Sequence, residues 1–108
     1  MTLRTLLLAG AATLALTGAA RAQADCETIT FADVGWTDIT ATTATATLIL
    51  EALGYGTETK LLSVPVTYSA MAEGDVDVFL GNWMPTMEAD LAPYRDAGTV
   101  EVLGTNLE

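Results

Sequence analysis

Two kinds of pattern alternate along the chain: short apolar or alternating runs, and longer segments whose apolar residues recur every three or four positions. The short runs are rich in β-branched and aromatic residues and predict four strands, at residues 28–32, 57–63, 75–80 and 99–103. The longer segments predict three helices, at residues 37–53, 65–73 and 87–96. Gly54, Gly74 and Gly98 follow these helices as stop signals, and Pro93 is expected to interrupt or restart the last one.

This βαβαβαβ order predicts an α/β fold built on one sheet. Strands that alternate with helices run mostly parallel, joined by right-handed crossovers, with helices on both faces of the sheet. The third run ends in apolar residues, as a strand buried on both faces does. We expect the strand order 2-1-3, which reverses between the first and the third strand. No linker or repeat divides residues 25–108, so they form one domain or one lobe.

A tryptophan follows each of the two strands that flank this reversal. Trp36 stands in the sequence Asp-Val-Gly-Trp-Thr-Asp, and Trp83 stands in Gly-Asn-Trp-Met-Pro. Open doubly wound sheets bind ligands beyond the carboxyl ends of their strands, where the order reverses, so we expect both indoles to face one crevice. A lone tryptophan after a strand is more often a packing residue. The equivalent position of these two, each near a glycine, favours a binding site.

An aromatic crevice of this kind suits a positively charged, poorly hydrated ligand. The indole face attracts a cation, and the methyl groups of a quaternary ammonium fit aromatic faces better than polar side chains. Asp38 adds charge or accepts a hydrogen bond from a ligand hydroxyl, although an acidic residue there also stabilises a helix N-terminus. Asn82 offers a further polar contact, with a turn-forming role as its alternative. Lys60 and Arg95 are expected away from both tryptophans, which disfavours a ligand that carries a carboxylate.

The charge of the chain argues against some classes of partner, and its residue types argue against catalysis. All 14 acidic residues but only two basic ones follow residue 24, a net charge of −12 that repels nucleic acid and anionic lipid. The chain contains no histidine and no nucleophile beside a base, so we predict no catalytic residues. Asp75 and Asp77 are expected at the amino end of their strand, opposite the crevice, which disfavours a paired-carboxylate role. We expect no metal site and no cofactor.

The first 24 residues are typical of a secretory signal peptide. Arg4 provides the positive start, residues 6–19 the apolar stretch, and the small residues up to Ala24 the cleavage site. The apolar stretch is shorter than the roughly 20 residues that span a bilayer, so the mature protein is predicted to be periplasmic and not membrane-spanning. Attachment of a lipid to Cys26 is disfavoured because Asp25 stands where a small residue is needed.

Cys26 is the single cysteine of a chain that we expect to be exported. In an oxidising compartment it is free, paired between molecules, or separated from a disulfide partner that this chain does not contain. The part that follows the predicted signal is short for the expected fold, and no terminating feature closes the sequence. We therefore expect residues 25–108 to be the N-terminal part of a longer domain, an incomplete first lobe.

Four stretches of the chain together resemble the choline-binding periplasmic proteins, which belong to the glycine betaine/proline betaine class of ABC-transporter substrate-binding proteins. They are residues 31–40, with the sequence FADVGWTDIT, residues 53–55, LGY, residues 62–66, LSVPV, and residues 77–85, DVFLGNWMP. The resemblance runs from about Ile29 to Val102, which is nearly all of the chain beyond the predicted signal.

The resemblance implies one lobe of a two-lobed, type II-like periplasmic binding protein that closes around choline in an aromatic box. It also implies delivery of the ligand to a membrane permease and its ATPase, with Trp36 and Trp83 as two walls of the box and Asp38 as a ligand contact. The other walls, and the partner of Cys26, would come from residues that this chain lacks. Proteins of the same family that bind glycine betaine, carnitine or proline betaine are near alternatives. An exported α/β hydrolase and a sensory ligand-binding domain are alternatives of another class.

Overall fold

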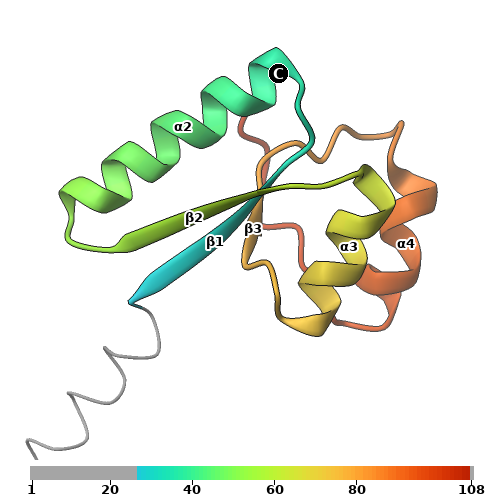
Figure 1. The fold of residues 1–108 in the computed structure, drawn as a ribbon. Helices are drawn as coiled ribbons and strands as arrows, with labels where there is room; N and C mark the ends of the chain where they lie inside the picture. Colours follow the sequence, from blue (N-terminus) through green and yellow to red (C-terminus); the bar gives the residue numbers. More distant parts are fainter. Residues whose placement is uncertain (1–26, 108) are drawn as a thin grey trace, which may run out of the picture.

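The structure, a computed structural model, describes residues 27–107. The predicted signal peptide, its cleavage site at Ala24 and Cys26 fall outside the described residues. The elements are β1 (Thr28–Asp33), α2 (Thr37–Ala52), β2 (Gly56–Leu61), α3 (Val64–Glu73), β3 (Val78–Phe79) and α4 (Glu88–Asp96). Figure 1 shows α2 on one side of the strands and the pair α3 and α4 on the other, which confirms the predicted α/β fold with helices on both faces.

The three strands form a parallel sheet in the order β2-β1-β3, as the sequence predicted. β1 and β2 pair along their whole length, from Thr28 opposite Gly56 to Asp33 opposite Leu61. β3 pairs with β1 at only two positions. Because all three strands run in one direction, the loops that leave β1 and β3 emerge next to each other at one end of the sheet.

β3 is much shorter than the strand predicted at residues 75–80, because the first residues of that run use other hydrogen-bond partners. The backbone N–H of Asp77 donates to the carbonyl oxygen of Thr30, but the N–H of Thr30 donates to the Asp77 carboxylate, each at 2.8 Å. The N–H of Asp75 turns back to the carbonyl oxygen of Ala70 in α3, also at 2.8 Å. A side chain and a helix end thus replace part of the expected ladder.

The prediction of a fourth strand at residues 99–103 is wrong. The N–H groups of Thr99 and Val100 donate to the carbonyl oxygen of Tyr94 at 3.0 and 3.3 Å, so this segment caps the end of α4 and pairs with no described strand. Val100 is buried in the core, and the described residues that follow it are exposed. The first two N–H groups of the expected strand therefore bond to the end of α4 and not to a neighbouring strand.

The helices begin and end within one residue of their predicted bounds. Pro65 occupies the first turn of α3, and Gly74 ends that helix with a φ of 83°, the left-handed conformation that favours glycine. α4 continues through Pro93, contrary to the predicted interruption, because Leu91 and Tyr94 on either side are packed in the core. None of the helices within residues 27–107 has both the length and the apolar character needed to cross a membrane.

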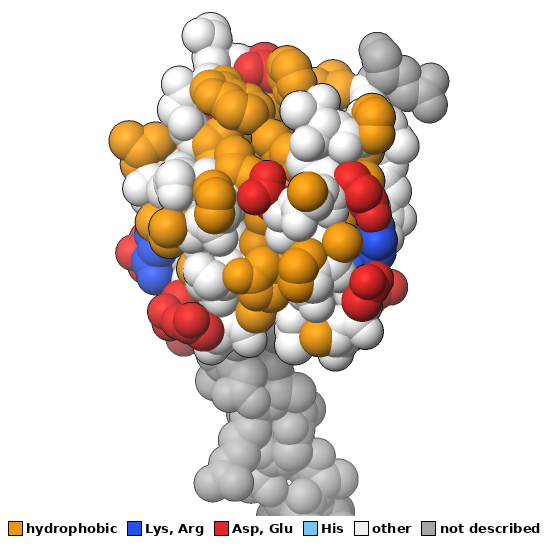
Figure 2. Space-filling view, turned by 90° about the vertical axis from the view of Figure 1, so that its right-hand side faces the viewer, with side chains coloured by type: hydrophobic (Ala, Val, Ile, Leu, Met, Phe, Trp, Pro, Cys, Tyr) orange, Lys and Arg blue, Asp and Glu red, His pale blue; other side chains and the backbone are white. Residues whose placement is uncertain are grey.

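The core beside α3 and α4 is built around Tyr68, Leu91 and Val100. The ring of Tyr68 meets Phe79 of β3 edge-on, with centroids 5.9 Å apart, and stacks on Tyr94 of α4 at 6.2 Å. On this side of the molecule, other apolar side chains reach the surface between acidic ones (Figure 2). The aromatic contacts tie both helices to β3 and so hold the loop that leaves this strand.

Candidate functional site

Trp36 lies in the loop that leaves β1 and directly precedes α2. Its backbone is extended, with φ −86° and ψ 136°, after Gly35 has turned the chain with a φ of 79°. The carbonyl oxygen of Trp36 accepts the first hydrogen bond of the helix, from the N–H of Thr40 at 2.8 Å. The side chain is 40% exposed, so the indole lies where a small molecule can contact it.

Trp83 occupies the equivalent place after β3, in the loop that leads to α4. The backbone N–H of Trp83 donates to Sδ of Met87 at 3.3 Å, and its backbone carbonyl oxygen accepts the N–H of Met87 at 2.8 Å. Met87 is buried, whereas Trp83 is 50% exposed. The loop is therefore held from inside the protein while its indole faces outward.

The structure brings the two indoles together. The ring centroids of Trp36 and Trp83 are 5.5 Å apart, and the ring planes make an angle of 61°, an edge-to-face contact. The two planes stand like adjacent walls of a corner. This meeting follows from the strand order, because the neighbouring strands β1 and β3 release their loops at the same end of the sheet. The role of the two rings in binding a ligand stays a prediction.

Gly81 allows the loop after β3 to approach the start of α2. A Cβ atom at this position would lie 2.8 Å from Cε2 of Phe79 and 3.0 Å from both Cγ atoms of Ile39, closer than carbon atoms pack. Ile39 stands in the first turn of α2 and is completely buried. Glycine here sets the separation between the helix that follows Trp36 and the loop that carries Trp83.

Asp33, which sequence reasoning did not select, organises the loop that carries Trp36. It ends β1 and is 8% exposed. One carboxylate oxygen accepts the N–H of Gly35 at 2.8 Å, and the other accepts the hydroxyl of Thr40 at 2.7 Å. An aspartate that accepts the N–H two residues further on is a common turn element, so the spacing of Asp33 and Gly35 was a usable signal.

Tyr68, which the sequence analysis did not select as a site residue, holds the loop that carries Trp83. Its hydroxyl donates to Oδ1 of Asn82 at 2.6 Å, and the same hydroxyl oxygen lies 3.5 Å from Sδ of Met87. Burial, together with the smaller effect of the charge of Asp90, raises the pKa of Tyr68 to about 12, so the hydroxyl stays protonated and can donate. Asn82, predicted to contact the ligand, uses its side-chain oxygen inside the protein, and its ligand contact stays a prediction.

Asp38, predicted to contribute charge or a hydrogen-bond acceptor, lies in the first turn of α2. It is half-buried, and its carboxylate accepts no hydrogen bond from the residues that the structure describes. Its backbone carbonyl accepts the hydroxyl of Thr42 at 2.8 Å. The carboxylate follows Trp36 by two residues, at the positive end of the helix dipole, so both roles considered for it remain open.

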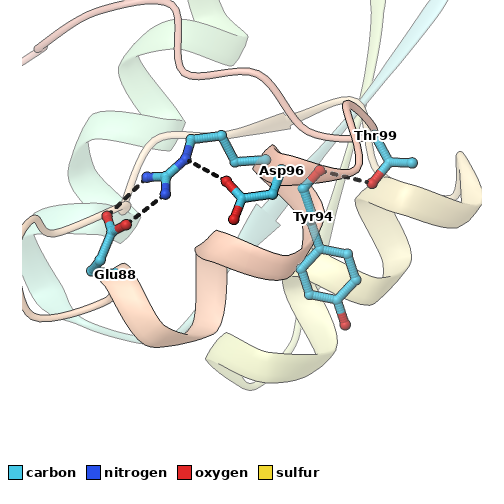
Figure 3. Close-up of polar contacts among 5 residues, drawn as sticks. Glu88, Tyr94, Asp96 and Thr99 are labelled. Atoms are coloured by element: carbon cyan, nitrogen blue, oxygen red, sulfur yellow. Dashed lines mark hydrogen bonds and ion pairs between the residues drawn. The ribbon is translucent and has the colours of Figure 1, made fainter.

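The two basic side chains of residues 27–107 are engaged outside the tryptophan loops. Arg95 forms a bidentate ion pair with Glu88, at 2.6 and 2.9 Å, and a longer contact with Asp96 at 3.4 Å (Figure 3). The hydrogen bonds between Arg95 and Glu88 lower the pKa of Glu88 and raise that of Arg95. Lys60 donates to the carbonyl oxygen of Asp75 at 3.1 Å. Within the described residues, no cluster of metal-ligating side chains is arranged to hold a metal ion.

Residues 27–108 match the family model described as the substrate binding domain of ABC-type glycine betaine transport systems. The sequence is also 52% identical over 84 residues to a protein of Chromohalobacter salexigens named uncharacterized protein ORF1. That match covers 78% of this chain and 54% of the relative. The chain thus spans about half the length of this curated relative.

Two solved structures share the fold of this chain. One is described as an ABC-transporter choline binding protein in complex with choline; it is 72% identical, has a TM-score of 0.68, and matches over 68% of this chain and 26% of its own. The other is an ABC-transporter choline binding protein in an unliganded semi-closed conformation, 69% identical with a TM-score of 0.71, over 77% of this chain and 29% of its own. The matched part is little more than a quarter of each of these proteins.

Proposed function

Because the chain belongs to the family of substrate-binding domains of ABC-type glycine betaine transport systems, we propose that it captures choline, or a closely related quaternary ammonium compound, for an ABC importer. The contact between Trp36 and Trp83 at 5.5 Å is the observation that carries the proposal. The 72% identity to a choline-binding protein in complex with choline supports the same ligand. The family is one of transport proteins, and capture requires binding alone.

Choline combines a permanent cation with a hydroxyl group, and the site has a partner for each. The trimethylammonium group has no N–H to donate, so indole faces satisfy it well, at about 2 kcal/mol per ring in a desolvated site. Asp38 contributes negative charge or accepts the hydrogen bond of the choline hydroxyl. Asn82 contributes its amide nitrogen, because its oxygen is held by Tyr68.

Glycine betaine is the second candidate ligand, favoured by the description of the family, and carnitine and proline betaine share its chemistry. These compounds have a quaternary nitrogen and a carboxylate, which needs cationic or N–H partners. Arg95 and Lys60 are engaged by Glu88 and by the carbonyl oxygen of Asp75. Because both basic side chains of the described residues are engaged elsewhere, the site favours the cation over the zwitterions.

In this proposal the mature protein works in the periplasm, after removal of the signal peptide predicted at residues 1–24. It passes the ligand to a membrane permease, whose ATPase drives import. The transport role of the family supports these partners, and the predicted signal supports the compartment.

Replacing either tryptophan by alanine tests the proposal. We expect Trp36→Ala and Trp83→Ala each to weaken choline binding by the full chain about 30-fold, the equivalent of one cation–π contact, in isothermal titration calorimetry. Tyr55→Ala is the matched control and should bind normally. Its side chain is as exposed as that of Trp36, 41% against 40%, but lies in the turn after α2. Unchanged choline affinity in both tryptophan variants would contradict the proposal.

A further inference from the structure

We propose that Asp33 is a positioning residue that fixes the indole of Trp36 against Trp83 and does not touch the ligand. It acts through its hydrogen bonds to Gly35 and Thr40. The inference rests on the function proposed above, in which Trp36 forms one wall of the binding site, and it assigns the orientation of that wall to a buried carboxylate.

The hydrogen bonds of Asp33 bracket Trp36 on both sides. Oδ1 holds Gly35, the residue before the tryptophan, at 2.8 Å. Oδ2 holds the hydroxyl of Thr40, in the first helical turn after it, at 2.7 Å. Thr40 is held a second time, since its N–H donates to the carbonyl oxygen of Trp36 at 2.8 Å. One carboxylate thus closes a ring of hydrogen bonds around the backbone of Trp36.

Trp36 depends on this ring because its own side chain does not anchor the loop. It precedes α2 without any side-chain hydrogen bond to the helix end. Gly35 before it has a φ of 79°, a conformation that glycine adopts as easily as several others. Without Asp33, the turn would be free to rotate, and the 5.5 Å contact with Trp83 would loosen.

The two carboxylates near Trp36 have different surroundings. Asp33 is buried with both oxygens engaged, whereas the half-buried carboxylate of Asp38 accepts no hydrogen bond from the described residues. Burying a carboxylate is costly unless it is hydrogen-bonded, and charge-assisted hydrogen bonds are about twice as strong as neutral ones. The charge of Asp33 therefore strengthens the turn, and of the two carboxylates only Asp38 is assigned a ligand contact in the function proposed above.

The chain contains two tryptophans, so each can be observed alone by fluorescence. In a Trp83→Phe background, Asp33→Asn should raise the acrylamide quenching constant of Trp36 and shift its emission toward that of solvated indole. In a Trp36→Phe background, the same Asp33→Asn change should leave the quenching of Trp83 unchanged, because Met87 holds that loop. A general loss of structure would instead alter both signals.

Choline titrations of the full chain, with both tryptophans present, provide the second readout. Asp33→Asn, which removes the negative charge from both hydrogen bonds, should weaken choline binding about tenfold. Thr40→Val, which removes one of the two bonds, should weaken it about threefold. Thr45→Val is the matched control and should bind normally, because this exposed hydroxyl in the same helix bonds, within residues 27–107, only to the carbonyl oxygen of Ala41.

Circular dichroism identifies the variants that fold. If Asp33→Asn does not fold, Thr40→Val tests the positioning role in its place. Unchanged choline affinity and unchanged Trp36 quenching in the folded variants would overturn the proposal. A chain that does not bind choline, but whose Trp36 signal responds to Asp33→Asn, would overturn the proposed function and uphold the positioning role. The two failures are therefore distinguishable.

Discussion

Tyr68 supports Trp83 much as Asp33 supports Trp36, but it does so from the core. Its ring is buried between Phe79 and Tyr94, and its hydroxyl reaches the loop after β3 through Asn82 and Met87. A phenol that is buried and donates a hydrogen bond is more stable as the neutral acid. The ionisation of Tyr68 therefore reports on the integrity of this loop.

The stability of the protein should fall as the pH rises from about 10 to 12. Burial, and secondly the charge of Asp90, raise the pKa of Tyr68 from the ordinary 10.0 to about 12, so the folded state favours the neutral phenol. This contribution to the free energy of unfolding is complete below the unfolded pKa and is lost as the pH rises through the folded one. Urea unfolding across this range measures the loss.

Tyr68→Phe is the control for this prediction, because phenylalanine keeps the ring contacts and cannot ionise. At neutral pH its free energy of unfolding should be lower by about 1 kcal/mol, the net value of one hydrogen bond. Its further decline at high pH should be shallower than that of the unaltered chain. An equally steep decline in both proteins would assign the effect to other groups.

The two tryptophans could be predicted from the sequence, and their supports only in part. Trp36 and Trp83 each follow a short apolar run that predicts a strand, and the parallel strand order then brings their loops together. Asp33 has a local signal, the glycine two residues later, which was not used. The partner of Tyr68, Asn82, lies 14 residues further along, and their contact depends on how α3 packs against β3. No local pattern encodes that packing.

At the scale of the elements, Gly81→Ala should force the loop after β3 away from α2. The added Cβ atom would press on the buried side chain of Ile39, and overpacking of this kind costs about 1–3 kcal/mol of unfolding free energy. Choline binding should also weaken, because Trp83 would shift away from Trp36. Urea unfolding and choline titration measure the two effects.

Gly104→Ala provides the comparison, since nothing lies within 4 Å of the Cβ atom it would add. It should leave both the unfolding midpoint and choline binding unchanged. A Gly81→Ala chain as stable as the unaltered protein would show that the loop and the helix can separate without cost, which contradicts the geometry derived for this contact.

Helices were predicted more accurately than strands, because their ends are marked by residues with local preferences. Pro65 and Gly74 bound α3 in this way. The strand predictions failed where a backbone N–H found a partner outside the sheet. The carboxylate of Asp77 accepts the hydrogen bond from the N–H of Thr30, and the N–H of Thr99 donates to a carbonyl oxygen at the end of α4. Such choices depend on three-dimensional neighbours, which alternation along the chain does not reveal.

At the scale of the whole molecule, the excess of acidic residues should speed the capture of a cation. The chain has 14 acidic and four basic residues, a net charge of −10, and acidic side chains stand between apolar ones on the face shown in Figure 2. We expect the association rate of choline to fall about threefold or more as salt is raised from roughly 20 to 500 mM, because salt screens this field. Stopped-flow tryptophan fluorescence measures the rate.

Glycine betaine, whose net charge is zero, is the comparison ligand and should associate at a rate that depends little on salt. Competition between the two ligands in the same buffer gives their order of affinity, with choline expected to bind more tightly. Equal salt dependence for both would show that the overall charge does not steer the ligand. Tighter binding of glycine betaine would assign the site to the zwitterion.

The α/β class, the strand order and the family were all predictable from the sequence. The class follows from the alternation of element types, which many residues support together. The family follows from the two loops at residues 31–40 and 77–85, whose residue types are more specific than any periodicity. Packing contacts such as that of Gly81 with Ile39 emerge only when the elements are assembled.

The first strand along the chain is the middle strand of the sheet, and this has a kinetic consequence. β1 has both of its neighbours only after residues 56–61 and 78–79 have joined it, and the contact between Thr30 and Asp77 spans 47 residues. Contacts between residues so distant in sequence form slowly, because closing a long loop costs chain entropy. We therefore expect the corner made by the two indoles to form late in folding, when β3 docks on a β1 strand that has already paired with β2.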